Sequence, residues 1–78
     1  MYQLKTNIDL KELFNCVRKC NSDVFFQTQD GDNLNLKSEL SHYVLMIVAN
    51  NNDFFLKGHI HCEDAADYEV LKDYVTEV

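Results

Sequence analysis

A β-hairpin is predicted in the middle of the chain, and it restricts the possible folds more than any other feature. Side chains at 24–28 alternate between two faces in the order Val-Phe-Phe-Gln-Thr, which is the pattern of a half-buried strand. Residues 33–37 repeat the alternation as Asn-Leu-Asn-Leu-Lys, and the Asp-Gly-Asp at 30–32 is a turn signal. We therefore expect an antiparallel sheet built around this hairpin.

Helices are predicted on both sides of the hairpin. Asp9 is a good N-cap because Glu12 follows three residues later, as in a capping box. Apolar residues then recur at helical spacing, so a helix is expected over residues 10–20. Ser38 is a natural N-cap for a second helix. That second helix carries four apolar or aromatic residues at helical positions, Leu40, Tyr43, Val44 and Ile47.

Two further strands and a third helix complete the predicted order. Residues 2–5 can form a short first strand, and residues 54–62 alternate as a longer fourth strand. Asp64 is expected to cap a last helix with an apolar stripe, made of Tyr68, Leu71, Val75 and Val78. The order (β)αββαβα predicts one α+β domain over residues 1–78. Its antiparallel sheet carries three helices on one face, and the other face is open to solvent.

Composition excludes several classes of function. The 78 residues are 46% hydrophobic, which indicates a folded domain, and the formal net charge is −6. Because the seven Lys and Arg residues are scattered, nucleic acid is not an expected partner. No apolar run reaches 18 residues, and the N-terminus lacks a signal-peptide core, so neither membrane insertion nor secretion is expected. Three cysteines, an odd number, suit reduced thiols in the cytoplasm.

Two short motifs in this order resemble the family of the phosphocarrier protein HPr. Residues 33–38, Asn-Leu-Asn-Leu-Lys-Ser, are similar to the family's Val-Asn-Leu-Lys-Ser signature, and residues 21–24, Asn-Ser-Asp-Val, are similar to the segment before its second strand. The element order resembles that of the family over nearly the whole chain. The resemblance implies an HPr-like open-faced β-sandwich, in which Ser38 would open the second helix as a regulatory phosphorylation site.

The family's catalytic segment is not matched. Where the family has its phosphoryl-accepting histidine, this chain has Thr6; Ile8 replaces the arginine and Asp9 the proline. A phosphohistidine needs an imidazole nitrogen, and Asp9 would repel an incoming phosphoryl group. We therefore expect a non-catalytic domain that is not an enzyme. The alternatives are a phosphocarrier of the phosphotransferase system using a non-standard histidine, with His42 near Ser38 as the candidate, and a generic small interaction domain.

The resemblance leaves two interpretations of Ser38. In the family's catabolite-repression paralogue the histidine is absent and the serine is kept, so phosphorylation of Ser38 could regulate a bacterial accessory domain. A phosphate there would sit at a helix N-terminus, where negative charge is favoured. The simpler interpretation is an N-cap worth about 1 kcal/mol.

Cysteines and histidines could suggest zinc, but their predicted faces argue against it. Cys16 and Cys20 share a helix face, whereas His59 and His61 should point to the open face of the sheet. We expect no metal and no cofactor.

A protein partner is expected instead, although the sequence does not identify it. If the alternation holds, Phe25 and Phe55 lie on the open face of the sheet, and two exposed phenylalanines there would form a binding patch or a homodimer contact. The second helix could also dock a partner through Leu40 or Tyr43, unless these side chains belong to the core.

Overall fold

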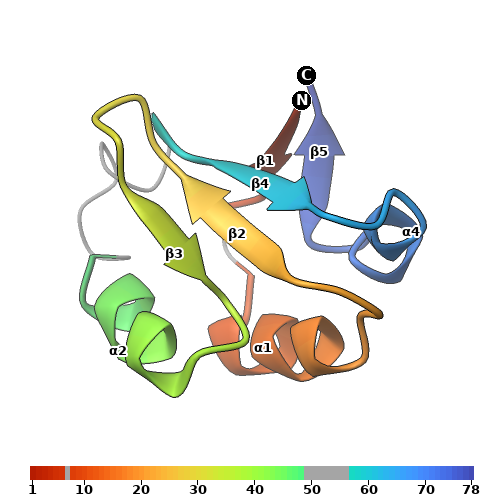
Figure 1. Cartoon of the computed structure of the whole chain (residues 1–78), viewed down its shortest axis with the longest axis horizontal. Helices are drawn as coiled ribbons and strands as arrows, with labels where there is room; N and C mark the ends of the chain where they lie inside the picture. Colours follow the sequence, from red (N-terminus) through yellow and green to blue (C-terminus); the bar gives the residue numbers. More distant parts are fainter. Residues whose placement is uncertain (7, 49–56) are drawn as a thin grey trace.

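The structure is a computed structural model that describes residues 1–6, 8–48 and 57–78, and it contains five strands and three helices in these segments (Figure 1). The strands are β1 (Tyr2–Leu4), β2 (Val24–Gln27), β3 (Asn33–Asn35), β4 (His59–Cys62) and β5 (Val75–Glu77). The helices are α1 (Leu10–Arg18), α2 (Glu39–Val48) and α4 (Asp67–Val70).

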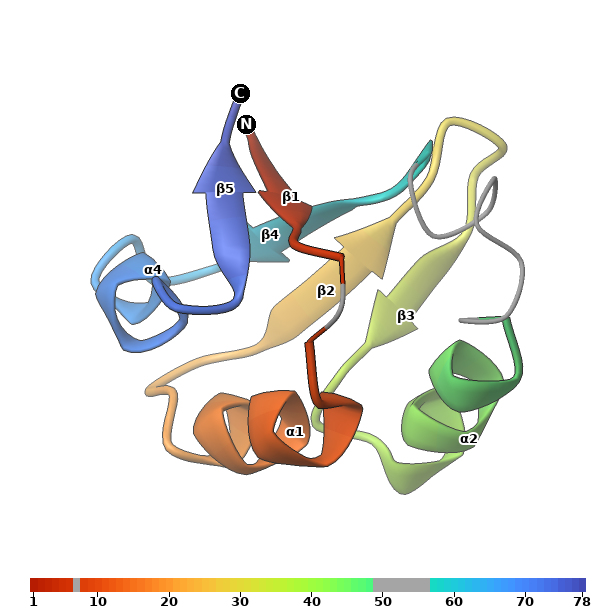
Figure 2. The ribbon, with the colours of Figure 1, turned by 180° about the vertical axis from the view of Figure 1, so that it is seen from behind.

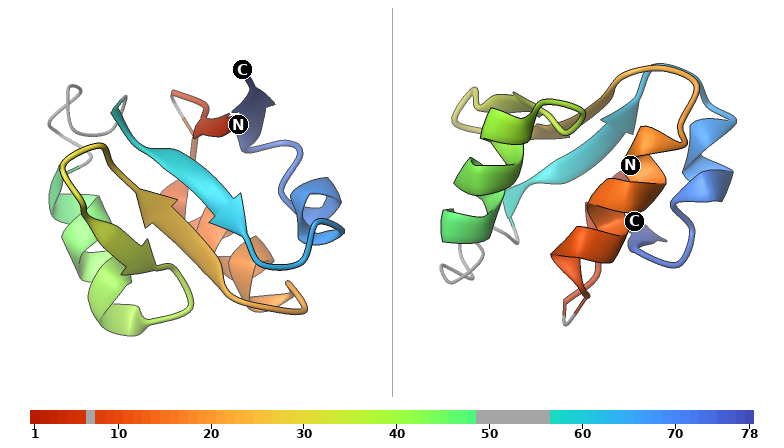
Figure 3. Two further views of the ribbon diagram at one scale, coloured as in Figure 1. Left: turned by 45° about the horizontal axis from the view of Figure 1, so that its top comes forward. Right: turned by 90° about the horizontal axis from the view of Figure 1, so that it is seen from below.

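All five strands belong to one antiparallel sheet of order β3-β2-β4-β1-β5. The sheet is strongly twisted, so that β5 stands steeply across the direction of β2 (Figure 1). Seen from behind, α1 and α2 lie next to each other along one end of the sheet (Figure 2). Seen from below, all three helices lie on the same side of the central strands (Figure 3). The predicted α+β open sheet is therefore confirmed.

The core lies between the sheet and the helices. Alternation in β2 sends Val24 and Phe26 to the helical side and leaves Phe25 and Gln27 partly exposed on the other side. Apolar side chains from all five strands, from α1 and α2 and from the connecting segments meet there, and β3 contributes Leu34, which is partly buried against this core. The buried apolar residues are Leu4, Leu13, Phe14, Val17, Cys20, Val24, Phe26, Leu36, Leu45, Ile60, Cys62, Leu71 and Val75.

Local sequence signals explain where helix α1 begins and where the β2–β3 hairpin turns. The Asp9 carboxylate accepts a hydrogen bond from the Lys11 N–H at 2.9 Å, which caps the first turn of α1 as predicted. The helix ends at Arg18, two residues earlier than expected. Gly31 adopts φ of 95° in the loop between β2 and β3, a conformation that a residue without a Cβ adopts readily.

The C-terminal prediction was wrong. The helix capped by Asp64 was expected to include Val75 and Val78, but α4 is only one turn long. Val75 instead starts β5, pairs with Leu4 and is buried, and the Val78 N–H donates to the Met1 carbonyl at 2.8 Å. A new edge strand satisfies more backbone groups and buries the β-branched Val75, which a short terminal helix could not do as well.

The first and fourth strands also differ in length from the prediction. β1 stops at Leu4, and β4 starts at His59 instead of residue 54. Residues 54–56 lie outside the described segments, so the first part of that predicted strand is not described.

A buried carboxylate ties α4 to the end of α1. Asp67 is fully buried, and it accepts hydrogen bonds from the N–H groups of Asn21 and Ser22 at 2.9 and 3.1 Å and from the Ser22 hydroxyl. These bonds, led by the Asn21 N–H, outweigh burial and hold the pKa of Asp67 below its usual value. Asp67 thereby fixes the connection between α1 and β2.

We expect Gly58→Ala to destabilise the fold. Gly58 is buried against the ring of Phe26, and a Cβ at residue 58 would overlap that ring. Phe26 is itself fully buried, so its ring has no room to move, and overpacking of this kind costs about 2 kcal/mol. Urea unfolding measures the loss. Gly31→Ala is the control, because that site has open space and adds only backbone strain; an equal or smaller loss for Gly58→Ala would contradict the packing described.

Asp67→Asn is expected to lower the urea midpoint at pH 7, because an amide cannot replace a carboxylate that accepts three hydrogen bonds. The folded pKa of Asp67 lies below the unfolded value of about 3.8, so its stabilisation is complete above that pH. The stabilisation is lost as the pH falls through the lower folded pKa. The difference between wild type and variant should therefore shrink in acid. The exposed Asp73→Asn is the control, and a difference independent of pH would disprove this role.

Candidate functional site

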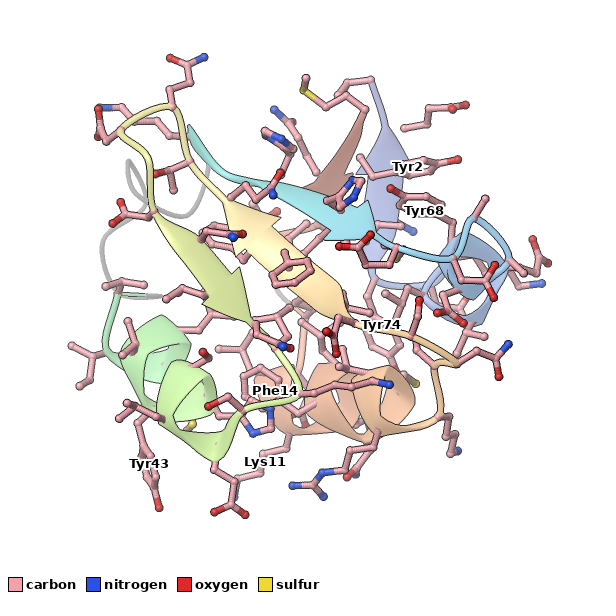
Figure 4. The ribbon with its side chains drawn as sticks, in the orientation of Figure 1. Tyr2, Lys11, Phe14, Tyr43, Tyr68 and Tyr74 are labelled. Carbon is pink, nitrogen blue, oxygen red and sulfur yellow. The ribbon has the colours of Figure 1, made fainter. Side chains whose placement is uncertain are left out.

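Helix α2 presents apolar side chains to solvent. Four of its apolar or aromatic residues are exposed, and we call them the α2 stripe: Leu40 (72% exposed), Tyr43 (66%), Met46 (44%) and Ile47 (73%). Each residue of the stripe lies within one helical turn of the next, and all four are on one side of the helix. The explanation that Leu40 and Tyr43 belong to the core is therefore wrong. Tyr43 projects away from the body of the domain (Figure 4).

The opposite side of α2 buries polar side chains. Ser41 and His42 are buried there with Leu45. The His42 ring stacks on Phe14 of α1, with ring centroids 3.9 Å apart and planes 5° apart. Its Nε2 contacts the Leu36 carbonyl. Because a carbonyl only accepts, Nε2 carries the proton in this hydrogen bond. These contacts fix the rotation of α2 and turn the α2 stripe outward.

A groove runs between α1 and α2. Both helices contribute residues at spacings of three, four and seven, which is one continuous face of each helix. The residues that line this α1–α2 groove are Lys11, Phe14, Asn15 and Arg18 from α1, and Glu39, His42, Tyr43 and Met46 from α2. Its volume is about 380 Å³. The groove shares Tyr43 and Met46 with the α2 stripe, so the two surfaces are continuous.

The α1 side of the groove is basic. Lys11 and Arg18 are exposed, and Arg18 donates a hydrogen bond to the Asn15 side chain at 3.4 Å. Within residues 1–6, 8–48 and 57–78 neither cation forms an ion pair; the pair found there joins Lys72 to Glu69. The groove therefore holds two cations and one carboxylate, in a chain with 13 carboxylates and seven Lys and Arg residues.

Ser38 lies immediately before α2 and is exposed. Its carbonyl accepts a hydrogen bond from the His42 N–H at 3.2 Å, so Ser38 occupies the N-cap position. Its hydroxyl makes no hydrogen bond to the described part of the chain. The side chain is thus open to solvent, next to Glu39.

The open face of the sheet carries the two histidines, as the alternation predicts. His61 is exposed and lies opposite Phe25, whereas Ile60 and Cys62 are buried on the helical side. Phe25 is only partly exposed. Phe55, its predicted companion, lies outside the described residues, so a two-phenylalanine patch is not described.

The thiols lie on the helical side of the sheet. Burial, with a smaller contribution from the nearby Asp67 carboxylate, raises the pKa of Cys20 to about 11 and that of Cys62 to about 12. Nucleophilic catalysis requires the thiolate, so neither is an activated nucleophile at neutral pH. In the described segments, no three His, Cys, Asp or Glu side chains converge on a point where a metal could bind.

Of the residues singled out from the sequence, His42 and Tyr43 line the groove and Leu40 lies exposed on the same helix. The basic side of the groove, formed by Lys11 and Arg18, was not predicted. Their separation of seven residues on α1 was a usable signal, because it places both on one helix face. The contact between α1 and α2 was not readable from either helix alone.

Comparison with known proteins adds no relative. No family model matches the chain, and neither a curated protein nor a solved structure does.

Among the helices in the described segments, none has the length and apolar character needed to span a bilayer.

Proposed function

We propose that this chain is a non-catalytic, HPr-like regulatory domain of the bacterial cytoplasm that works by binding another protein. The observation that carries the proposal is the inverted burial of α2, which exposes Leu40, Tyr43 and Ile47 while burying Ser41 and His42. Exposing three large apolar side chains on one helix face is unfavourable unless a partner covers them. The partner is an amphipathic helix of another protein, because such a helix offers the matching apolar ridge.

The HPr-like part of the proposal rests on the sequence motif and its place in the topology. Residues 35–38, Asn-Leu-Lys-Ser, lead from β3 into α2, as the resemblance implies. The order of the described elements from β1 to β4 supports this proposal, whereas β5 has no counterpart in the order expected from the sequence.

Phosphorylation of Ser38 is the proposed switch. The hydroxyl is exposed at the N-terminus of a ten-residue helix, where the first N–H groups can receive a phosphate. The new charge would lie two residues from Leu40, the first residue of the α2 stripe. An apolar partner would dock less well beside it.

A phosphocarrier that uses His42 is the second candidate. One observation favours it: Arg18, the only arginine in the chain, lines the same groove as His42, and a guanidinium stabilises phosphoryl groups. Against it, His42 is only 9% exposed, with one ring face on Phe14 and Nε2 at the Leu36 carbonyl. The binding domain therefore remains the first proposal.

The docking proposal predicts a loss of affinity when the α2 stripe is made polar. A photo-crosslinking residue at position 43 would identify the partner in cells that produce the chain, with position 72 as the control. Calorimetry with the purified partner should show at least about tenfold weaker binding for Leu40→Ser/Ile47→Ser, because two apolar contacts are lost.

The matched control for that experiment is Val70→Ser/Val78→Ser, which alters two exposed apolar side chains away from α2. All variants should keep their unfolding free energy within about 0.5 kcal/mol. Equal affinity of the α2 variant and the control variant would refute docking through the α2 stripe.

A phosphorylation experiment distinguishes the proposed switch at Ser38 from a phosphocarrier that uses His42. Intact mass would be measured after incubation with an HPr kinase and ATP, and separately with enzyme I and phosphoenolpyruvate. We expect one added phosphate with the kinase, and none in Ser38→Ala. Labelling by enzyme I alone, lost in His42→Ala, would establish the phosphocarrier instead. No label from either system would remove both mechanisms and leave the docking proposal.

A further inference from the structure

We infer that the helix bound by this domain is acidic on one flank and lies lengthwise in the α1–α2 groove. The inference rests on the proposed docking function and adds the chemistry of the partner. Its basis is the juxtaposition of the α2 stripe with Lys11 and Arg18 across a groove of about 380 Å³.

The dimensions of the groove suit a helix. Lys11 and Arg18 are seven residues apart on α1, which is two turns or about 10 Å along the axis. The α2 side covers the same span, from Glu39 to Met46. A third helix lying along this seam would pack its apolar side on Tyr43 and Met46, with ridges in the groove as helices normally pack.

The charges that line the groove determine which charge the flank of the partner helix should carry. Lys11 and Arg18 are exposed cations without an ion pair in the part of the chain that the structure describes. Two carboxylates seven residues apart on the partner would match their spacing, since both repeats span two turns. Arg18 can hold a carboxylate with two parallel hydrogen bonds. Glu39, on the α2 side of the groove, disfavours an acidic residue there and so orients the partner.

Other occupants fit less well. A membrane with anionic lipids would repel a chain of net charge −6. A second copy of this chain that docked through the same groove by two-fold symmetry would place the two positively charged grooves against each other, and they would repel. An acidic helix from a different protein meets both the apolar and the charged requirement.

The test uses three synthetic 20-residue amphipathic peptides with the same leucine face. Their flank carries two glutamates seven residues apart, two glutamines or two lysines. Binding to the full chain is measured by fluorescence anisotropy at low and high salt, and the site is mapped by amide chemical shifts. The glutamate peptide should bind about fivefold tighter than the glutamine peptide at low salt, which is the scale of two exposed ion pairs. High salt should abolish the difference.

Three double variants locate the binding site. Lys11→Gln/Arg18→Gln should remove the preference for glutamate, whereas Lys5→Gln/Lys72→Gln changes the net charge equally and should keep it. Tyr43→Ser/Met46→Ser, which removes the two apolar contacts of α2 inside the groove, should weaken the binding of all three peptides. Shifts should cluster on α1 and α2.

The outcomes distinguish the inference from the proposal beneath it. Equal binding of the three peptides, weakened by Tyr43→Ser/Met46→Ser, would overturn the acidic flank and leave docking on the α2 stripe intact. Peptide binding that is unchanged in Tyr43→Ser/Met46→Ser, or no binding of the glutamate peptide at millimolar concentration, would overturn the inference. Insensitivity to the α2 variant would also count against the docking proposal.

Discussion

The stacking of His42 on Phe14 is the contact on which the exposed surface depends. It joins α1 to α2, and the bond to the Leu36 carbonyl anchors the same ring to the segment after β3. A helix fixed on one side by these contacts has no freedom to rotate. Its remaining apolar residues, Leu40, Tyr43 and Ile47, therefore face solvent. The fixed rotation of α2 therefore has two results: the polar His42 ring lies in the core, and apolar side chains lie on the surface.

The two ends of the domain are organised differently. At the α1–α2 end, one of the buried polar groups is the His42 ring, which also lines a groove. At the α4 end, the buried Asp67 carboxylate accepts backbone hydrogen bonds from Asn21 and Ser22 and has a structural role. Ionised groups are tolerated in a core only with such partners. The groove at the α1–α2 end is thus open to a ligand, whereas the Asp67 carboxylate at the α4 end is buried and committed to the fold.

Local signals predicted the elements that depend on few residues. The Asp9 cap and the spacing after it gave α1, and the alternation around Asp-Gly-Asp gave β2 and β3. The last strand was missed because three residues, Val75 to Glu77, carry little periodicity and gain their stability from β1. The rotation of α2 was also hidden. Apolar residues occur on both sides of that helix, and the side that is buried depends on tertiary contacts such as that of His42 with Phe14, 28 residues earlier.

The central claim is that α2 buries His42 and exposes its apolar side in the free protein. Nuclear magnetic resonance tests it directly, through contacts between ring protons and through the effect of a soluble paramagnetic probe on methyl groups. We predict nuclear Overhauser contacts between His42 and Phe14, together with strong relaxation of the Leu40 and Ile47 methyls and protection of the Leu45 methyls. Protected Leu40 and Ile47 methyls with core contacts, and a His42 ring open to solvent, would contradict the account.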